Sequence, residues 1–136
     1  MTQEDIAREK AAIAELIARY NLAVDHNDFP GYAACFTPDG IFDGIIGRFA
    51  VHQELDRFIE AVQKLAATAP NFRHFVTNIL TEIHGDAASS RSFILMTSTT
   101  QEGGARIAAV GEYEDRLVKI GGQWLFRERK VHIDGA

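Results

Sequence analysis

The hydrophobic positions in the first 25 residues recur with the period of a helix. They follow one another at spacings of three, four and seven residues, which places them on one helical face: Ile6, Ile13, Leu16, Ile17, Tyr20 and Val24. Thr2 and Asp5 have the spacing of a capping box, with Asp in place of the usual Glu. The pattern therefore predicts a helix that begins after Thr2 and packs one apolar face on a core.

Shorter elements are expected after this helix. Asp28 can cap a short helix through the segment FPGYAACF, because proline is tolerated in a first helical turn. The TPDG segment at 37–40 predicts a turn. The apolar segment IFDGII at 41–46 predicts a strand, and a second apolar stripe between Val51 and Leu65 predicts another helix.

From residue 72 onward the apolar period changes from about 3.6 to two, which indicates strands. Glycine-bearing turns separate four candidates, at 72–83, 88–100, 105–119 and 123–133. Helices followed by a meander of strands predict an α+β domain, with helices on one face of a curved sheet. With no internal linker, residues 1–136 form a single domain.

Composition narrows the class of protein. A hydrophobic fraction of 46% with 24% charged residues is typical of a globular domain. The net charge of -5 disfavours nucleic acid as a partner, because binding phosphates requires a basic face. Cys35 is the only cysteine, which excludes an internal disulfide and a thiolate zinc cluster. The sequence shows neither an export signal nor an apolar run of membrane-spanning length, so we expect a cytoplasmic protein without a membrane partner.

The segment RHFVTN at 73–78 places polar groups in a strand that otherwise looks buried. Alternation puts His74 and Asn78 on one face with Val76. Either neighbouring side chains satisfy the imidazole and the carboxamide, or a ligand does. Histidine titrates near neutral pH, so His74 is a candidate general base, and Asn78 is a candidate substrate-binding residue.

Two residues of the first helix are further candidates. Asp25 ends the helix at the margin of the apolar stripe, where a carboxylate is unfavourably placed against the helix dipole. It is either an exposed terminal carboxylate or a group held by another residue. Tyr20 lies in the stripe itself, as a core aromatic or as a hydrogen-bond donor to an oxyanion.

The last strand, WLFRERKVHI, carries Arg129. Strict alternation puts Trp124 and Phe126 on one face and Arg129 on the other, with Leu125 and Val131. The arginine either packs its stem on an apolar surface with its head in water or serves a cavity that needs a positive charge. The histidines lack metal-ligand spacing, so no metal site is expected.

Three segments together, covering nearly the whole chain, resemble one family: ELIARYNLAVDHNDFPGYAACFTPDGIFD, FRHFVTNILTEIHGDAA and GEYEDRLVKIGGQWLFRERKV. They are similar to the SnoaL-like branch of the nuclear transport factor 2-like (NTF2-like) superfamily. Within it, the chain most resembles scytalone dehydratase, hexachlorocyclohexane dehydrochlorinase and the bile-acid 7α-dehydratases. The resemblance implies a cone-shaped α+β fold, whose known members include dehydratases, isomerases, cyclases and binding modules.

The resemblance also implies roles for single residues. His74 matches the catalytic histidine of the dehydratase-like members, and Asp25 the aspartate that orients it. Tyr20 resembles the tyrosine of the bile-acid dehydratases, and Arg129 a cavity arginine of the dehydrochlorinase. Phe42 resembles an aromatic residue of the pocket wall. The strand expected to hold the second catalytic histidine of scytalone dehydratase reads SRSFILMTS, without a histidine.

These observations predict a cofactor-independent lyase of the dehydratase or dehydrohalogenase type. Its partner is a small hydrophobic or cyclic substrate, from which a His–Asp dyad in an apolar cavity eliminates water or HX. The alternatives are an isomerase like ketosteroid isomerase or a polyketide cyclase, and a non-catalytic module that binds small molecules. Apolar residues on both faces of the expected sheet, together with the resemblance, predict a homodimer or homotrimer.

Overall fold

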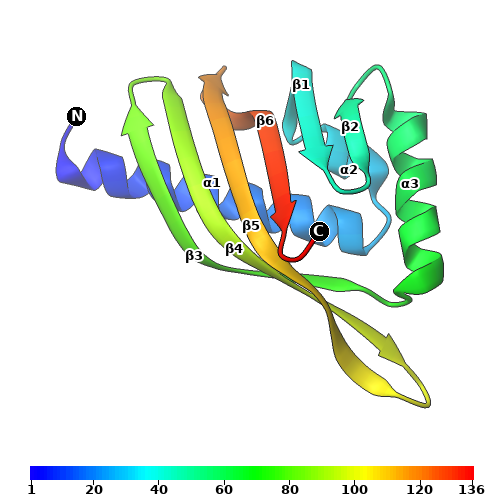
Figure 1. The fold of residues 1–136 in the computed structure, drawn as a ribbon. Helices are drawn as coiled ribbons and strands as arrows, with labels where there is room; N and C mark the ends of the chain where they lie inside the picture. The colour runs from blue at the N-terminus through cyan, green and yellow to red at the C-terminus, as the bar shows by residue number, and fades with distance from the viewer.

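The computed structural model describes residues 1–136 as helices packed against one curved mixed sheet. Figure 1 shows α1 crossing behind the strands and α3 standing beside β2. In chain order the elements are α1 (Gln3–Asp25), α2 (Phe29–Ala33), β1 (Phe36–Gly44), β2 (Gly47–Ala50), α3 (Leu55–Thr68), β3 (Arg73–His84), β4 (Ala87–Thr100), β5 (Gly104–Ile120) and β6 (Gln123–Ile133). The expected α+β architecture is confirmed.

The six strands are arranged in the order β2-β1-β6-β5-β4-β3. β1 and β6 pair in parallel, and every other neighbouring pair is antiparallel. Hairpins join the last four strands, as the glycine-bearing turns predict, and the β4–β5 hairpin projects beyond the rest of the sheet (Figure 1). The sheet edge that carries β3 packs on α1, so residues of the two elements can meet.

Both ends of α1 follow from local sequence. At the start, Thr2 accepts a hydrogen bond from the Asp5 backbone and the Asp5 side chain accepts one from Thr2, which completes the expected capping box. At the other end the chain leaves the helical conformation at Asn27, whose φ is 57°. The helix therefore stops with Asp25 as its last residue, at the rim of the sheet.

The short helix α2 also forms as expected. Asp28 Oδ1 accepts a hydrogen bond from the Gly31 backbone N–H at 3.0 Å. A Cβ at Gly31 would lie 2.3 Å from Asp28 Oδ2, so any other residue at this position would displace the capping carboxylate. The capped helix α2 connects the end of α1 to the start of β1.

The expected turn at 37–40 is wrong, because these residues belong to β1. From Phe36 to Ile41 β1 advances five residues, while its partner β6 advances only from Phe126 to Glu128. Residues 37–40 therefore form a bulge relative to β6, and β1 continues through them as one strand. The strand β2, which pairs with the second half of β1, was not expected either.

The core lies between the helices and the inner face of the sheet, and aromatic rings dominate it. Tyr32 stacks on Phe58 with ring centroids 4.1 Å apart. Tyr20 contacts both Tyr32 and Phe126, at 5.4 and 5.7 Å. No helix of the protein combines the length and the apolar character that crossing a bilayer requires.

Candidate functional site

Asp25 and His74 meet where the end of α1 packs on the start of β3. Oδ1 of Asp25 lies 2.5 Å from Nδ1 of His74, and Oδ2 accepts the His74 backbone N–H at 2.9 Å. Both carboxylate oxygens of Asp25 therefore bind a single residue. The sequence separation is 49 residues, so the tertiary fold creates this pair.

The pairing fixes the state of the imidazole ring. An ionised carboxylate can only accept hydrogen bonds, so the proton of neutral His74 lies on Nδ1. Nε2 is then the acceptor nitrogen. A T-shaped contact with Phe72, with ring centroids 5.5 Å apart, further restrains the orientation of the ring. This is the arrangement in which a carboxylate orients a histidine base.

His74 lines a cavity of about 420 Å³, whose other walls come from α1, α3 and the sheet. This volume lies within the range of small-molecule sites. Apart from tyrosines, the only polar side chains in the wall are those of Thr68, His74 and Arg106. The apolar lining includes Val24, Phe58, Val62, Leu65, Phe72, Ile94, Met96 and Val131.

Tyr20 and Phe42, which the family resemblance singled out, both line this cavity. Burial raises the pKa of Tyr20 well above its ordinary value, with a smaller contribution from Tyr113. The phenol is therefore a neutral hydrogen-bond donor at physiological pH. Phe42 is buried and contacts the ring of Phe58 edge-on at 5.4 Å.

Arg129 is fully buried, and it does not line this cavity. Its Nε and Nη2 donate to Oδ1 and Oδ2 of Asp115 at 2.9 and 3.4 Å. The guanidinium lies 3.5 Å from the ring centroid of Tyr113 and 4.3 Å from that of Tyr20. Both rings belong to the cavity wall, so Arg129 lies behind it.

The expected alternation of β6 is wrong at Arg129, and a β-bulge is the reason. Arg116 of β5 pairs with Glu128, but the next residue, Leu117, pairs with Phe126. Arg127 is therefore an extra residue in β6. It shifts the alternation by one position, so that Arg129 joins Phe126 on the inner face of the sheet.

Burial and mutual attraction oppose each other in both members of this ion pair, and a different one prevails in each. Burial raises the pKa of Asp115 to about 6, against the attraction of Arg129. Burial alone would lower the pKa of Arg129, but attraction to Asp115 outweighs it and the pKa is raised. Arg129 thus stays charged at every physiological pH, and Asp115 is the member of the pair that titrates.

The structure does not bring Asn78 to the cavity. Asn78 is exposed, has a φ of 56°, and lies at an irregularity of β3, where Thr77 pairs with Phe93 and Leu80 with Arg91. The bulge ends the alternation that the sequence predicted for His74, Val76 and Asn78. Asparagine is one of the few residue types that tolerate this left-handed conformation.

Three residues of the site were missed by the sequence analysis. Tyr113 and Asp115 on β5 follow the inward alternation that ends at Leu117, and this periodicity was the available signal. The Tyr113 hydroxyl donates to Asn21 Oδ1 on α1 at 3.0 Å. Arg106, near the start of β5, had no such signal, because only the fold brings it to the cavity.

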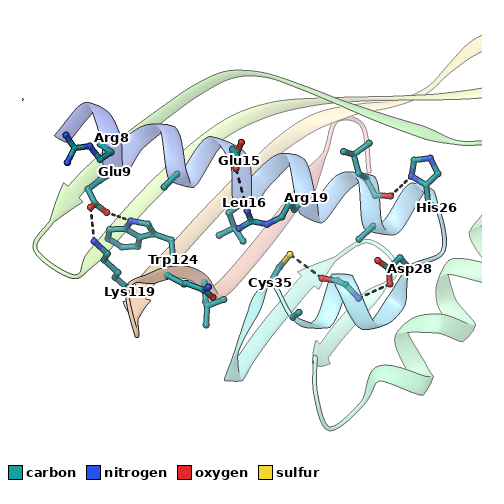
Figure 2. A pocket seen from close by; sticks show the side chains of 18 residues that line it. Arg8, Glu9, Glu15, Leu16, Arg19, His26, Asp28, Cys35, Lys119 and Trp124 are labelled. Atoms are coloured by element: carbon teal, nitrogen blue, oxygen red, sulfur yellow. Dashed lines mark hydrogen bonds and ion pairs between the residues drawn. The ribbon is translucent and has the colours of Figure 1, made fainter. Parts of the chain in front are cut away.

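A second hollow, of about 860 Å³, lies along the other side of α1 (Figure 2). It is larger, but its charged groups neutralise one another. Glu9 accepts hydrogen bonds from Lys119, at 2.7 Å, and from the Trp124 indole, and Arg19 pairs with Glu15 at 3.7 Å. Histidine, cysteine and carboxylate side chains do not form a cluster of metal-ligand type anywhere in the protein. The cavity beside His74 is therefore the better candidate for chemistry.

Comparison with known proteins places the chain in a family. Residues 5–130 match the family model described as the SnoaL-like domain. A protein of unknown function from Mycobacterium tuberculosis is 34% identical, with a TM-score of 0.84 over 96% of this chain and 75% of that one. No curated protein matches the sequence.

More distant structures show the same fold. An NTF2-like protein with a cystatin-like fold from Novosphingobium aromaticivorans is 18% identical, with a TM-score of 0.82 over 98% of this chain and 88% of that one. A scytalone dehydratase-like protein from the same organism is 23% identical, with a TM-score of 0.77 over 97% of this chain and 88% of that one. The chain therefore belongs to the SnoaL-like domain family and has its NTF2-like fold.

Proposed function

We propose that the protein is a cofactor-independent lyase that eliminates water or HX from a small hydrophobic or cyclic substrate. The observation that carries the proposal is the Asp25–His74 hydrogen bond of 2.5 Å beside an apolar cavity. Histidine is the side chain most often used as a general base in enzymes.

In the proposed reaction, Nε2 of His74 removes a proton from a carbon next to a carbonyl or to the carbon that carries the leaving group. The electrons of the broken C–H bond form the new double bond, and the leaving group departs with its bonding pair. Asp25 stabilises the resulting imidazolium and keeps the ring oriented. When hydroxide leaves, the imidazolium proton converts it to water; when a halide leaves, the proton passes to solvent.

Tyr20 is the donor that we assign to the departing group or to a developing enolate oxygen. Its hydroxyl is neutral and lies in the wall of the same cavity. Arg129 stands behind the Tyr20 ring, 4.3 Å from its centroid. A cation held against an aromatic ring polarises it, so Arg129 supports the phenol as a positioning residue and does not itself meet the substrate.

The test is a screen of small hydroxylated or halogenated cyclic carbonyl compounds, with products analysed by mass. Elimination lowers the mass by water or HX, whereas isomerisation or cyclisation without loss keeps it. His74→Ala and Asp25→Asn should each lower turnover by about 10²–10⁴-fold. Tyr20→Phe should lower kcat by about 10²–10³-fold, as expected for loss of one oxyanion donor.

The matched control is His132→Ala. His132 is also paired with a carboxylate, Glu114 at 3.1 Å, but on the exposed surface of β6. Its replacement should leave turnover unchanged. Full elimination by a folded His74→Ala or Asp25→Asn protein, with circular dichroism like that of the wild type, would remove the proposed mechanism.

The proposal includes a homodimer or homotrimer formed by the outer face of the sheet. Phe75, Leu95 and Val110 form one cross-strand row on that face, and Phe75 and Val110 are exposed. Burial of such a row in a subunit interface would remove apolar surface from water. Light scattering coupled to size-exclusion chromatography gives the native mass, and a monomer would exclude this part of the proposal.

A further inference from the structure

Arg106 is the only permanently charged side chain in the wall of the cavity beside His74. It lies near the start of β5 and is exposed, so the guanidinium stands at the mouth of the cavity. The rest of the wall is almost entirely apolar. A single cation at the entrance of an apolar cavity fits a ligand with an apolar body and an anionic end.

The position of Arg106 is restrained by the segment that follows α3. Its Nη2 donates to the carbonyl oxygen of Thr68, the last residue of that helix, at 3.1 Å. A cation is favoured at a helix C-terminus. The pairing residue on β4, Ser98, donates to the carbonyl of Pro70 at 2.6 Å. Both strands of the projecting hairpin are thus tied to the cavity rim.

The charge of Arg106 has no carboxylate partner. Among the other exposed arginines, Arg48, Arg57 and Arg91 each pair with an acidic side chain. Arg73, Arg116 and Arg127 also lack such a partner, but they lie outside the cavity wall, and no acidic residue lines the cavity. A guanidinium has five N–H donors, and the Thr68 carbonyl occupies one of them. Donors therefore remain for a carboxylate, whose two oxygens match the planar fork of arginine.

The sheet register gives the backbone separation between Arg106 and His74. His74 pairs with Met96, and Met96 pairs with Ala109, so these three residues form one row across the sheet. The row itself spans two strand spacings, about 10 Å from His74 to Ala109. Arg106 lies three residues further along β5, past a bulge, which adds at most about 10 Å in the perpendicular direction. The two backbones are thus up to about 14 Å apart, and the two side chains span part of that distance, so a ligand that reaches both groups needs a body of at least two fused rings.

We propose that Arg106 binds the carboxylate of an amphipathic substrate and thereby directs its apolar ring body toward His74. This inference rests on the proposed function, because it names the class of substrate for that site: a bicyclic or similarly sized acid. It needs no new catalytic step. Arg106 acts on specificity, through binding at the entrance.

The experiment compares two ligands of the same shape, 2-naphthoate and its neutral amide 2-naphthamide. Dissociation constants are measured by calorimetry at pH 7 and low salt, for the wild type, Arg106→Gln, Arg106→Lys and the control Arg91→Gln. We expect the wild type to prefer the acid by about three- to tenfold, because the site is partly exposed. The preference should disappear in Arg106→Gln, persist in part in Arg106→Lys, and remain in Arg91→Gln.

The outcomes distinguish failure of the Arg106 proposal from failure of the proposed function. Equal affinity for the two ligands in the wild type, no binding of either, or an acid preference that survives in Arg106→Gln would each overturn the proposal. Binding requires no turnover, so these failures leave proton removal by His74 untouched. Conversely, an acid-selective protein whose His74→Ala variant retains elimination would keep the Arg106 subsite and refute the proposed function.

Discussion

Two pairs of a carboxylate with a basic side chain lie inside this protein, and only one of them borders a cavity. Asp25–His74 joins the end of α1 to β3, with side chains 9% and 12% exposed. Asp115–Arg129 joins β5 to β6, and both of its side chains are 0% exposed. His74 lines the apolar cavity, whereas Arg129 is separated from it by the rings of Tyr20 and Tyr113.

The comparison shows that burial alone does not identify a catalytic group. The more deeply buried pair has no contact with a space that a substrate can enter, so it can act only through the aromatic rings beside it. The less buried pair has a free imidazole nitrogen and a cavity next to it. We therefore expect changes in the Asp115–Arg129 pair to alter stability first, and changes in the Asp25–His74 pair to alter chemistry first.

The largest expected effect on stability comes from Arg129→Met. The substitution leaves Asp115 buried without its partner, and breaking a buried pair in this way costs about 3–5 kcal/mol of unfolding free energy. Urea denaturation at pH 7 measures the loss. Asp25→Asn should cost only about 1 kcal/mol in the same assay, because an asparagine oxygen can still accept one of the two hydrogen bonds.

The double variant Arg129→Met, Asp115→Leu tests the reason for that loss. Replacing both members of a buried pair by apolar residues is often neutral, so the double variant should recover most of the stability. If Asp25→Asn proved as destabilising as Arg129→Met, the division between a structural and a chemical pair would be lost.

A smaller effect is expected in the pH dependence of stability. The pKa of Asp115 is about 6 in the folded protein, against an ordinary value of 3.8, and burial is the main cause. Because the folded state holds this proton more tightly, the contribution of Asp115 to the unfolding free energy decreases as the pH rises through this window. Asp115→Asn lacks the decrease, so the deficit of the variant relative to the wild type should shrink by up to about 3 kcal/mol between pH 4 and 7.

Urea titrations of the wild type and Asp115→Asn at several pH values measure this deficit. Subtracting one profile from the other removes the contributions of the remaining carboxylates, which are common to both proteins. A deficit that grows with pH would mean that attraction to Arg129 outweighs burial, and the assigned direction of the Asp115 pKa would then be wrong.

The sequence predicted the fold well because the relevant signals are local. The four long strands 72–83, 88–100, 105–119 and 123–133 match β3 to β6 to within one residue at each end. Their glycine turns and their period of two do not depend on the rest of the chain. The juxtaposition of Asp25 and His74 did not follow from periodicity, and only the family resemblance predicted it.

Three of the errors share one physical cause, which is the β-bulge. A bulge adds a residue to one strand, so every side chain beyond it changes face. Alternation therefore failed at Arg127 in β6 and at Asn78 in β3, and the segment at 37–40, expected as a turn, forms a bulge in β1. A bulge depends on pairing with a neighbouring strand, which a single strand pattern does not contain. Arg129 was consequently predicted on the wrong face, and Asn78 at a cavity that it does not reach.

The smallest expected effect concerns this last residue, and two substitutions isolate it. Asn78 has a φ of 56°, a conformation that costs alanine about 1–2 kcal/mol and glycine almost nothing. Asn78→Ala should therefore destabilise the protein by about 1 kcal/mol, and Asn78→Gly should be nearly neutral in urea denaturation. Neither should change KM, since Asn78 is exposed and outside the cavity wall. A rise in KM shared by both variants would indicate that Asn78 contacts the substrate, and that β3 rearranges at this bulge during turnover.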